Sequence, residues 1–270
     1  MGVIDSSSGA IQMQRKHHGR VIETSIRIKT SPQKAWEAWA DPQQIANWFV
    51  DRAEGEAKAG STMKWFFEAF NYKLDIPIIE AEPGRTFVTG GGPQPGTDGL
   101  PYLMEITIEK DGDSTVMNLV NSGFSEKPEK HGTYRDTDSG WKCALLTMKV
   151  WLERYPELRR RRTIVMRSKP HSPERRHELY ATVNGRRQWL APDIPVDGEV
   201  LIDTGTEVML DWPSERSVLG LKSFDMGPQQ VVALDLSVWS ADAPAASAAG
   251  AMADREARMN RALDRLISLL

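Results

Sequence analysis

Apolar and polar residues alternate along several stretches of the first half of the chain. The alternation runs through residues 22–28, 63–68 and 104–109. A period of two predicts antiparallel strands with one buried face and one face in water. Asp111-Gly112 then marks a turn into residues 115–120, which predicts a β-hairpin.

Helix signals stand between and after these strands. Ser31-Pro32 and Asp41-Pro42 each combine a capping side chain with proline at the first helical position, so two short helices are predicted. A long helix is predicted over residues 131–155. The apolar residues of its predicted buried face are Trp141, Leu145, Met148 and Leu152.

The order of these elements predicts an α+β helix-grip fold, in which a curved antiparallel sheet wraps around a long C-terminal helix. The second half repeats the landmarks, because Ser172-Pro173 follows Ser31-Pro32 by 141 residues. We predict two copies in tandem, the second degenerate, shorter and without the Trp48-Phe49 elbow of the first. Strands are predicted at 163–166, 200–202, 208–212, 218–221 and 231–239, and an amphipathic helix after the Ala-rich stretch 243–253.

The predicted domain organisation has three parts. Residues 1–18 are polar and predict a disordered tail. Residues 19–156 would form the first copy of the fold, and residues 157–270 the second, shorter one.

Composition narrows the class of protein. The chain has 270 residues, a net charge of −3 and a sequence pI of about 6.0. Proteins that bind nucleic acid through surface charge are usually basic, so we expect no nucleic-acid partner. No run approaches the roughly 18 apolar residues of a membrane span, so we expect no membrane insertion. Cys143 is the single cysteine, which excludes an intramolecular disulfide and suits a cytoplasmic protein.

Searches for catalytic and ligating motifs find none. The sequence contains no G-x-S-x-G, no phosphate-loop G-x-x-x-x-G-K and no H-E-x-x-H. We therefore expect no metal and no cofactor, and leave open whether the chain is an enzyme. Cys143 is interpreted as a small buried hydrophobe. The run Arg159–Arg162 is interpreted as a solvated linker and strand start, with a protein partner or an anionic ligand as the alternative.

Four ordered segments resemble a known family. They are residues 26–50, 78–87, 104–124 and 140–152. Together they resemble START-like (SRPBCC, Bet v 1-like) domains, in the branch named after activators of the heat-shock-chaperone ATPase. The resemblance covers residues 20–155 and implies a deep cavity between sheet and long helix. Members bind lipids, polyketides or other apolar molecules, and relatives occur in antibiotic, polyketide and enediyne pathways, including as self-resistance proteins.

Aromatic side chains concentrate on the predicted inward faces of the first copy. Such rings suit a planar apolar ligand, although simple core packing is the alternative. We predict that they wall a cavity for a hydrophobic small molecule of aromatic or polyketide type. The predicted ligand-binding residues are Trp39, Trp48, Phe49, Trp65, Phe67, Met104, Ile106, Trp141, Leu145 and Met148.

Three other functions fit the same resemblance. A polyketide cyclase or aromatase would need a polar residue that projects into the cavity. A self-resistance protein could donate hydrogen from Gly90–Gly92, which lie in residues 90–96, a predicted flexible loop. A regulator of the chaperone ATPase would act through an exposed surface, a function implied by the branch name alone.

Overall fold

The computed structural model describes residues 17–93, 97–226, 229–241 and 245–270. The chain divides into two compact units. The first contains the chain up to Asp138 together with Met148–Glu153, and the second contains Ser139–Thr147 and Arg154–Leu270. Residues 1–16 of the predicted tail lie outside the described residues. His17 and His18 do contact the first unit, where His17 Nδ1 lies 3.1 Å from Ser122 Oγ.

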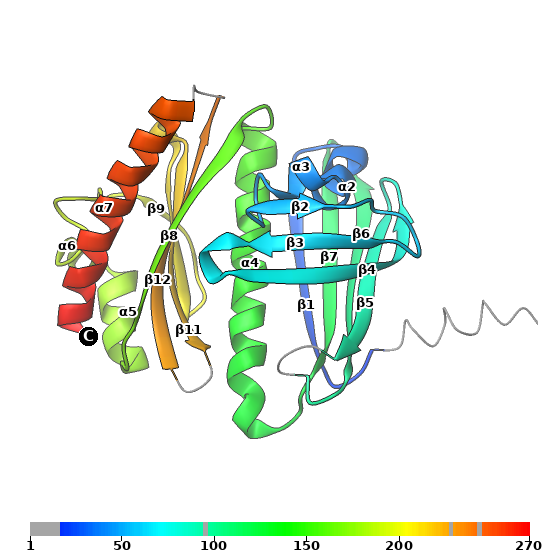
Figure 1. The fold of residues 1–270 in the computed structure, drawn as a ribbon, viewed down its shortest axis with the longest axis horizontal. Helices are drawn as coiled ribbons and strands as arrows, with labels where there is room; N and C mark the ends of the chain where they lie inside the picture. Colours follow the sequence, from blue (N-terminus) through cyan, green and yellow to red (C-terminus); the bar gives the residue numbers. More distant parts are fainter. Residues whose placement is uncertain (1–16, 94–96, 227–228, 242–244) are drawn as a thin grey trace, which may run out of the picture. The chain divides into compact units, whose positions relative to one another are not determined.

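The first unit is built on a seven-stranded antiparallel sheet with the strand order β1-β7-β6-β5-β4-β3-β2 (Figure 1). The sheet is followed by one long helix, as the helical spacing of apolar residues within 131–155 predicted. The elements are β1 (Arg20–Ile28), α2 (Pro32–Ala40), α3 (Pro42–Ile45), β2 (Arg52–Glu54), β3 (Thr62–Phe67), η1 (Glu68–Phe70), β4 (Tyr72–Glu82), β5 (Thr86–Pro93), β6 (Pro101–Asp111), β7 (Ser114–Phe124), η2 (Pro128–Lys130) and α4 (His131–Arg154).

The local start and turn signals act as predicted. Ser31 Oγ accepts a hydrogen bond from Lys34 N at 3.3 Å, and Asp41 Oδ1 accepts one from Gln43 N at 2.7 Å. These bonds satisfy amide groups that would otherwise be orphaned at the two helix starts. Between β6 and β7, Gly112 has a φ of +65°, which explains why glycine stands in this tight hairpin turn.

The predicted flexible loop at residues 90–96 is wrong over Gly90–Gly92, which belong to β5. Gly90 pairs with Leu103 and Gly91 with Tyr102 on β6. A Cβ at Gly90 would lie 2.8 Å from the carbonyl oxygen of Tyr102, closer than real Cβ contacts. Glycine therefore permits a close approach of two strands here. Residues 94–96 lie outside the described residues.

The long helix α4 lies against β1 within the first unit. Near its start, Tyr134 Oη donates to Val21 O at 3.0 Å. Near its end, Lys149 Nζ donates to Arg27 O at 2.8 Å, and Glu153 Oε1 accepts from Lys29 N at 2.7 Å. Contacts at both ends of β1 hold the helix along the sheet, which is the helix-grip arrangement that the sequence predicted.

The second unit repeats the element order with two strands fewer. Its five-stranded antiparallel sheet has the order β8-β12-β11-β10-β9, and α7 crosses one face of it (Figure 1). The helix α7 begins inside the Ala-rich stretch rather than after it. The elements are β8 (Arg159–Ser168), α5 (Pro173–Ala181), α6 (Val183–Arg187), β9 (Glu199–Asp203), β10 (Glu207–Trp212), η3 (Pro213–Glu215), β11 (Ser217–Met226), β12 (Gln229–Ser240) and α7 (Ala245–Leu269).

The second copy lacks the Trp-Phe pair, as the sequence predicted, but it keeps a tryptophan at the corresponding place. Trp189 Nε1 donates to Leu179 O at 3.0 Å, as Trp48 Nε1 donates to Ala38 O at 2.8 Å in the first unit. Both tryptophans are fully buried. In each unit the tryptophan comes shortly after a pair of short helices. The next residue differs between the units, because Leu190 stands where the first unit has Phe49.

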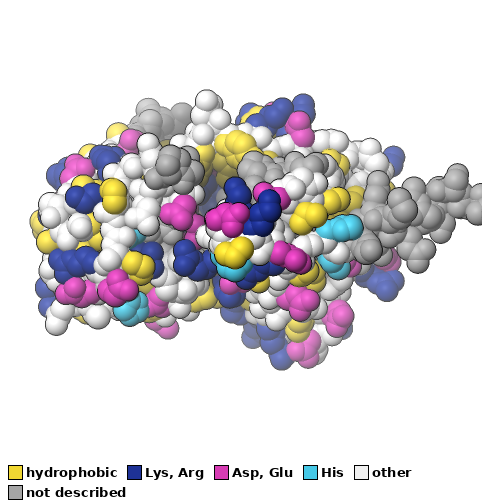
Figure 2. Space-filling view, turned by 90° about the horizontal axis from the view of Figure 1, so that it is seen from below, with side chains coloured by type: hydrophobic (Ala, Val, Ile, Leu, Met, Phe, Trp, Pro, Cys, Tyr) yellow, Lys and Arg dark blue, Asp and Glu magenta, His cyan; other side chains and the backbone are white. Residues whose placement is uncertain are grey.

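The arginine run at residues 159–162 forms the first part of β8, which confirms the predicted strand start but not the solvated linker. Arg162 is the clearest departure, because its side chain is only 12% exposed and pairs with Asp235. Elsewhere the charges are mixed. On the face of the molecule in Figure 2, Lys and Arg side chains lie among Asp and Glu over much of the described surface.

Candidate functional site

Five of the predicted ligand-binding residues form one aromatic cluster in the first unit. The cluster is Trp39 from α2, Trp48 and Phe49 from the segment after α3, and Trp65 and Phe67 from β3. Phe49 is its centre. The ring centroids of Phe49 lie 5.2 Å from Trp48, 5.4 Å from Trp65, 5.6 Å from Phe67 and 6.4 Å from Trp39.

The rings of the aromatic cluster pack against one another in the edge-on and offset geometries that aromatic pairs prefer. Trp39 and Trp48 meet edge to face at 4.7 Å with an interplanar angle of 72°. Each such pair contributes about 0.5–1.5 kcal/mol beyond the area that it buries. The cluster therefore already stabilises the first unit, and its contact with a ligand stays a prediction.

One indole N–H of the aromatic cluster, that of Trp65, differs from the other two in its hydrogen bonding. Trp39 Nε1 donates to Met117 Sδ at 3.0 Å, and Trp48 Nε1 donates to Ala38 O. Trp65 is 3% exposed, and its Nε1 has no hydrogen-bond partner among the described residues. A buried indole N–H normally finds an acceptor, so this donor is available to a bound molecule.

The other predicted residues are buried on β6 and α4. Met104 and Ile106 are fully buried on one face of β6. Trp141 and Leu145 lie in the part of α4 that belongs to the second unit, whereas Met148 belongs to the first. All five side chains are apolar and at most 6% exposed. Their burial agrees with the helical and strand periodicity, and a ligand contact is not tested by it.

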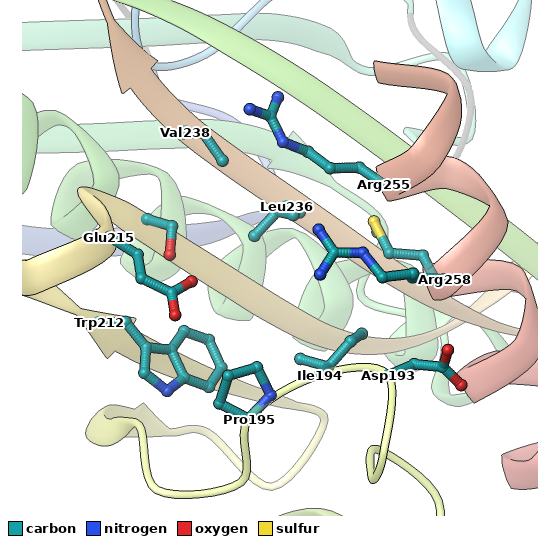
Figure 3. A pocket seen from close by; sticks show the side chains of 11 residues that line it. Asp193, Ile194, Pro195, Trp212, Glu215, Leu236, Val238, Arg255 and Arg258 are labelled. Atoms are coloured by element: carbon teal, nitrogen blue, oxygen red, sulfur yellow. The ribbon is translucent and has the colours of Figure 1, made fainter. Parts of the chain in front are cut away.

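A cavity lies in the second unit, in a place that sequence reasoning missed. Its volume is about 240 Å³, and it lies between the sheet and α7 (Figure 3). It is bounded by the end of β10, the turn η3, β11 and β12, the loop before β9 and one face of α7. The residues that line this α7 pocket are Asp193, Ile194, Pro195, Trp212, Glu215, Ser217, Leu236, Val238, Arg255, Arg258 and Met259.

Trp212 forms one wall of the α7 pocket and is held in place from behind. Its Nε1 donates to Asp197 Oδ1 at 3.3 Å. A Cβ at Gly198 would lie 2.7 Å from Cε2 and Cζ2 of Trp212, so glycine lets the ring pack on the backbone. Trp212 ends β10 before η3, as Phe67 ends β3 before η1. The wall of the pocket is therefore the counterpart of a residue that the sequence placed in the first-unit site.

The loop that closes the α7 pocket is clamped to the helix by an acidic residue. Asp193 Oδ1 accepts from Arg261 Nη2 at 2.6 Å, and Asp193 Oδ2 lies 2.8 Å from Arg265 Nη2. Hydrogen bonds from Arg261 and Arg265 lower the pKa of this carboxyl, against a smaller opposing effect of burial. Arg265 Nε also donates to Trp189 O at 2.9 Å, so the same arginine links α7 to the residue after α6 that forms the elbow.

A second polar site is a buried charge network on β8, β10, β11 and β12. Arg162 Nε and Nη2 donate to the two oxygens of Asp235 at 2.9 and 2.8 Å, and Lys222 Nζ lies 3.2 Å from Asp235 Oδ2. Lys222 Nζ also lies 3.6 Å from Glu207 Oε2. Burial opposes the charge on Asp235, but Arg162 and Lys222 hold its pKa well below the usual range. Burial likewise opposes the charge on Lys222, while Glu207 and Asp235 raise its pKa.

Cys143 lies beside this buried charge network within the second unit. Burial raises the pKa of the thiol well above its ordinary value, and the nearby Glu207 carboxylate adds to the effect. The side chain is 2% exposed. A thiol kept protonated and out of water is a poor nucleophile, which argues for the structural role that the sequence suggested.

Two further observations concern metals and membranes. In the part of the chain that the structure describes, no group of three or more His, Cys, Asp or Glu is placed to hold a metal ion. None of the helices in the described ranges combines the length and the apolar character needed to cross a membrane.

The sheet, the elbow and the gripped helix define the class of protein. It is an α+β protein of the START-like, helix-grip class, with the element order present in both units. Residues 29–153 match the family model described as "Activator of Hsp90 ATPase homolog 1-like protein". The resemblance drawn from the four sequence segments is thereby confirmed. The curated proteins include no match to this chain.

Solved structures give similarities at low sequence identity. The Aha1 dimer from Colwellia psychrerythraea is 22% identical, with a TM-score of 0.44, over 50% of this chain and 96% of that one. CalU16 from Micromonospora echinospora is 21% identical, with a TM-score of 0.39, over 49% of this chain and 73% of that one. DynU16, a protein in the dynemicin biosynthetic locus, is 12% identical, with a TM-score of 0.41, over 92% and 98%.

Proposed function

We propose that this protein binds a small, flat, largely apolar molecule, and that the α7 pocket of the second unit holds it. The observation that carries the proposal is the half-open cavity of about 240 Å³ between α7 and the sheet. Trp212, Leu236 and Met259 supply apolar surface around it. A concave apolar site with a few convergent polar groups is the usual form of a small-molecule site.

The size of the α7 pocket limits the ligand. Sites for drug-sized molecules have volumes of roughly 300–1,000 Å³. A cavity of about 240 Å³ suits one or two fused rings, or one end of a longer molecule. The indole of Trp212 offers a flat face for offset stacking, and its fixed orientation means that little freedom is lost on binding.

A first-unit site remains a second candidate. The unpartnered Nε1 of Trp65, inside the aromatic cluster, favours it, because a ligand with a hydrogen-bond acceptor would satisfy that donor. In this case the predicted residues of the aromatic cluster would contact the ligand directly. The two sites differ in chemistry, since the α7 pocket carries charged side chains at its edge and the aromatic cluster does not.

The chemistry of the ligand suggests a biological role. We propose that the protein acts in natural-product biosynthesis or self-resistance, where planar aromatic or polyketide molecules are the ligands. A cyclase or aromatase is the alternative, and Glu215 favours it, because this carboxyl lines the α7 pocket and could exchange a proton with a bound chain. Regulation of a chaperone ATPase is the weaker alternative, since no described feature of the surface favours that partner.

Calorimetric titration with 2-naphthol, a neutral two-ring probe, tests the proposal. Val238→Phe places a ring in the α7 pocket and should weaken binding at least about tenfold, because the probe and the new ring compete for one space. Val200→Phe is the matched control, since Val200 is 43% exposed on β9 of the same unit. If Trp65→Phe abolishes binding and Val238→Phe does not, the site lies in the first unit.

A further inference from the structure

Two arginines extend from α7 over the α7 pocket. Arg255 and Arg258 stand three residues apart, so they project from the same face of the helix. Figure 3 shows both guanidinium groups directed from α7 toward the cavity, with Trp212 and Pro195 across from them. The cationic groups and the aromatic wall therefore lie on opposite sides of one space.

The positive charge of Arg255 is not balanced by its neighbours. Arg258 Nε lies 3.2 Å from Asp254 Oδ2, so this arginine has an acidic partner. Arg255 is half-buried and has no ion pair among the residues that the structure describes. Burial lowers the pKa of Arg255, and the neighbouring cations Arg258 and Arg161 lower it further, opposed by Asp254 alone.

The acidic residues of the α7 pocket do not cancel this charge. Asp193 is engaged by Arg261 and Arg265, which point to it from the next turns of α7. Glu215 is exposed on η3, on the far side of the cavity from the two arginines, and no ion pair joins it to either within the described residues (Figure 3). An anion beside Arg255 would face Glu215 only across the cavity.

We infer that the α7 pocket takes an aromatic or other flat apolar molecule bearing a carboxylate or similar anion, with the anion at Arg255 and Arg258 and the apolar body against Trp212. The inference rests on the proposed function of this pocket and adds the charge of the ligand. A planar guanidinium matches the two oxygens of a carboxylate, and bonds of this kind are stronger than neutral ones. Partial burial reduces screening by salt, so the attraction survives at physiological ionic strength.

The test compares 2-naphthoate with 2-naphthamide, which have nearly the same shape and differ in charge. Titration calorimetry at pH 7 should show the carboxylate binding at least about tenfold more tightly than the amide, the factor that about 1.4 kcal/mol supplies. Raising the salt concentration should weaken the carboxylate alone. Arg255→Met should bring the affinity for the carboxylate down to that for the amide, and leave the amide unchanged.

A control variant tests whether the effect comes from Arg255 itself or from the loss of any positive charge on the second unit. Arg187→Met removes an exposed arginine of the same unit that contacts Asn184 and does not line the pocket, and it should change neither affinity. Equal binding of both probes to the unaltered protein would overturn the anion inference and leave the proposed function standing. Failure of both probes to bind at millimolar concentration would overturn both. An equal loss of both probes in Arg255→Met would show that this residue shapes the pocket, which also overturns the charge assignment.

Discussion

The indole N–H of Trp189 donates to the carbonyl oxygen of Leu179, ten residues earlier, across the elbow between α5 and the chain that follows α6. Trp48 and Ala38 stand in the same relationship 141 residues earlier in the sequence. A carbonyl at a helix end lacks its intrahelical donor, and a buried one needs a substitute. The tryptophan supplies that donor in both units.

Trp189→Phe should destabilise the second unit. The change removes the donor to Leu179 and leaves its buried carbonyl unpaired, which costs about 1–3 kcal/mol, with a further loss of packing. Urea unfolding followed by circular dichroism measures the effect. Trp48→Phe should lower the stability of the first unit by a similar amount, whereas Tyr72→Phe, at an exposed position, should change it little. A Trp189→Phe protein as stable as the unaltered one would mean that the elbow does not depend on this bond.

The parts of the fold that sequence predicted well are those set by local periodicity. The face of β1 that carries Ile22 and Ile28 is buried, and the capping residues Ser31 and Ser172 act where they were expected. The elbow at Trp189 was not predicted, because the first copy has a Trp-Phe pair there and in the second copy Leu190 follows the tryptophan. Trp189 does follow Trp48 by 141 residues, the spacing of the two Ser-Pro landmarks, and this spacing is the signal that could have located the elbow.

The α7 pocket could not be predicted in the same way. Asp193, Trp212, Leu236 and Arg255 come from four segments, and only the tertiary fold brings them together. The pattern of α7 predicts an amphipathic helix, and charged residues outside the apolar stripe of such a helix usually face water. In the first unit Trp39, Trp48 and Trp65 are buried, and Phe49 and Phe67 are partly buried. Periodicity cannot tell a ring that lines a cavity from a ring that fills one.

Asp235→Asn should be strongly destabilising. The carboxylate balances Arg162 and Lys222 in a site where all three side chains are largely out of water. Removing one member of a buried ion network leaves an uncompensated charge and costs about 3–5 kcal/mol. Urea unfolding provides the number. Asp75→Asn is the control, because Asp75 pairs with Lys73 at an exposed position and should cost less than about 1 kcal/mol.

The same network predicts a pH dependence of stability. The pKa of Asp235 is lowered in the folded protein, so its contribution is present above the unfolded value of about 3.9 and is lost as the pH falls below it. The pKa of Lys222 is raised, so its contribution is present below about 10.4 and is lost at higher pH. Thermal melts between pH 2 and pH 5 should therefore show a shallower acid limb in Asp235→Asn. An identical slope in both proteins would contradict the assignment.

Cys143 should be unreactive in the folded protein. Its thiol is buried, and the raised pKa keeps the fraction of thiolate small at neutral pH. Labelling with iodoacetamide should be slower than in urea by about two orders of magnitude or more, since access requires an opening of the structure. A Val200→Cys variant in a Cys143→Ala background places a thiol on the surface and should react at the rate of a free cysteine. Rapid labelling of native Cys143 would show that this part of α4 opens readily.

Two glycines of β5 should differ in their response to alanine. A Cβ at Gly90 would lie 2.8 Å from Tyr102 O and 3.0 Å from Ile79 Cδ1, so Gly90→Ala must push β5 from its neighbours and should cost about 1–3 kcal/mol. At Gly92 no atom lies within 4 Å of the added carbon, so Gly92→Ala should stay within about 0.5 kcal/mol of the unaltered protein. Both variants are compared by thermal unfolding. The two glycines lie in the same strand, so Gly92→Ala is the matched control. An equal loss of stability in both variants would mean that the close approach of β6 at Gly90 does not explain the glycines.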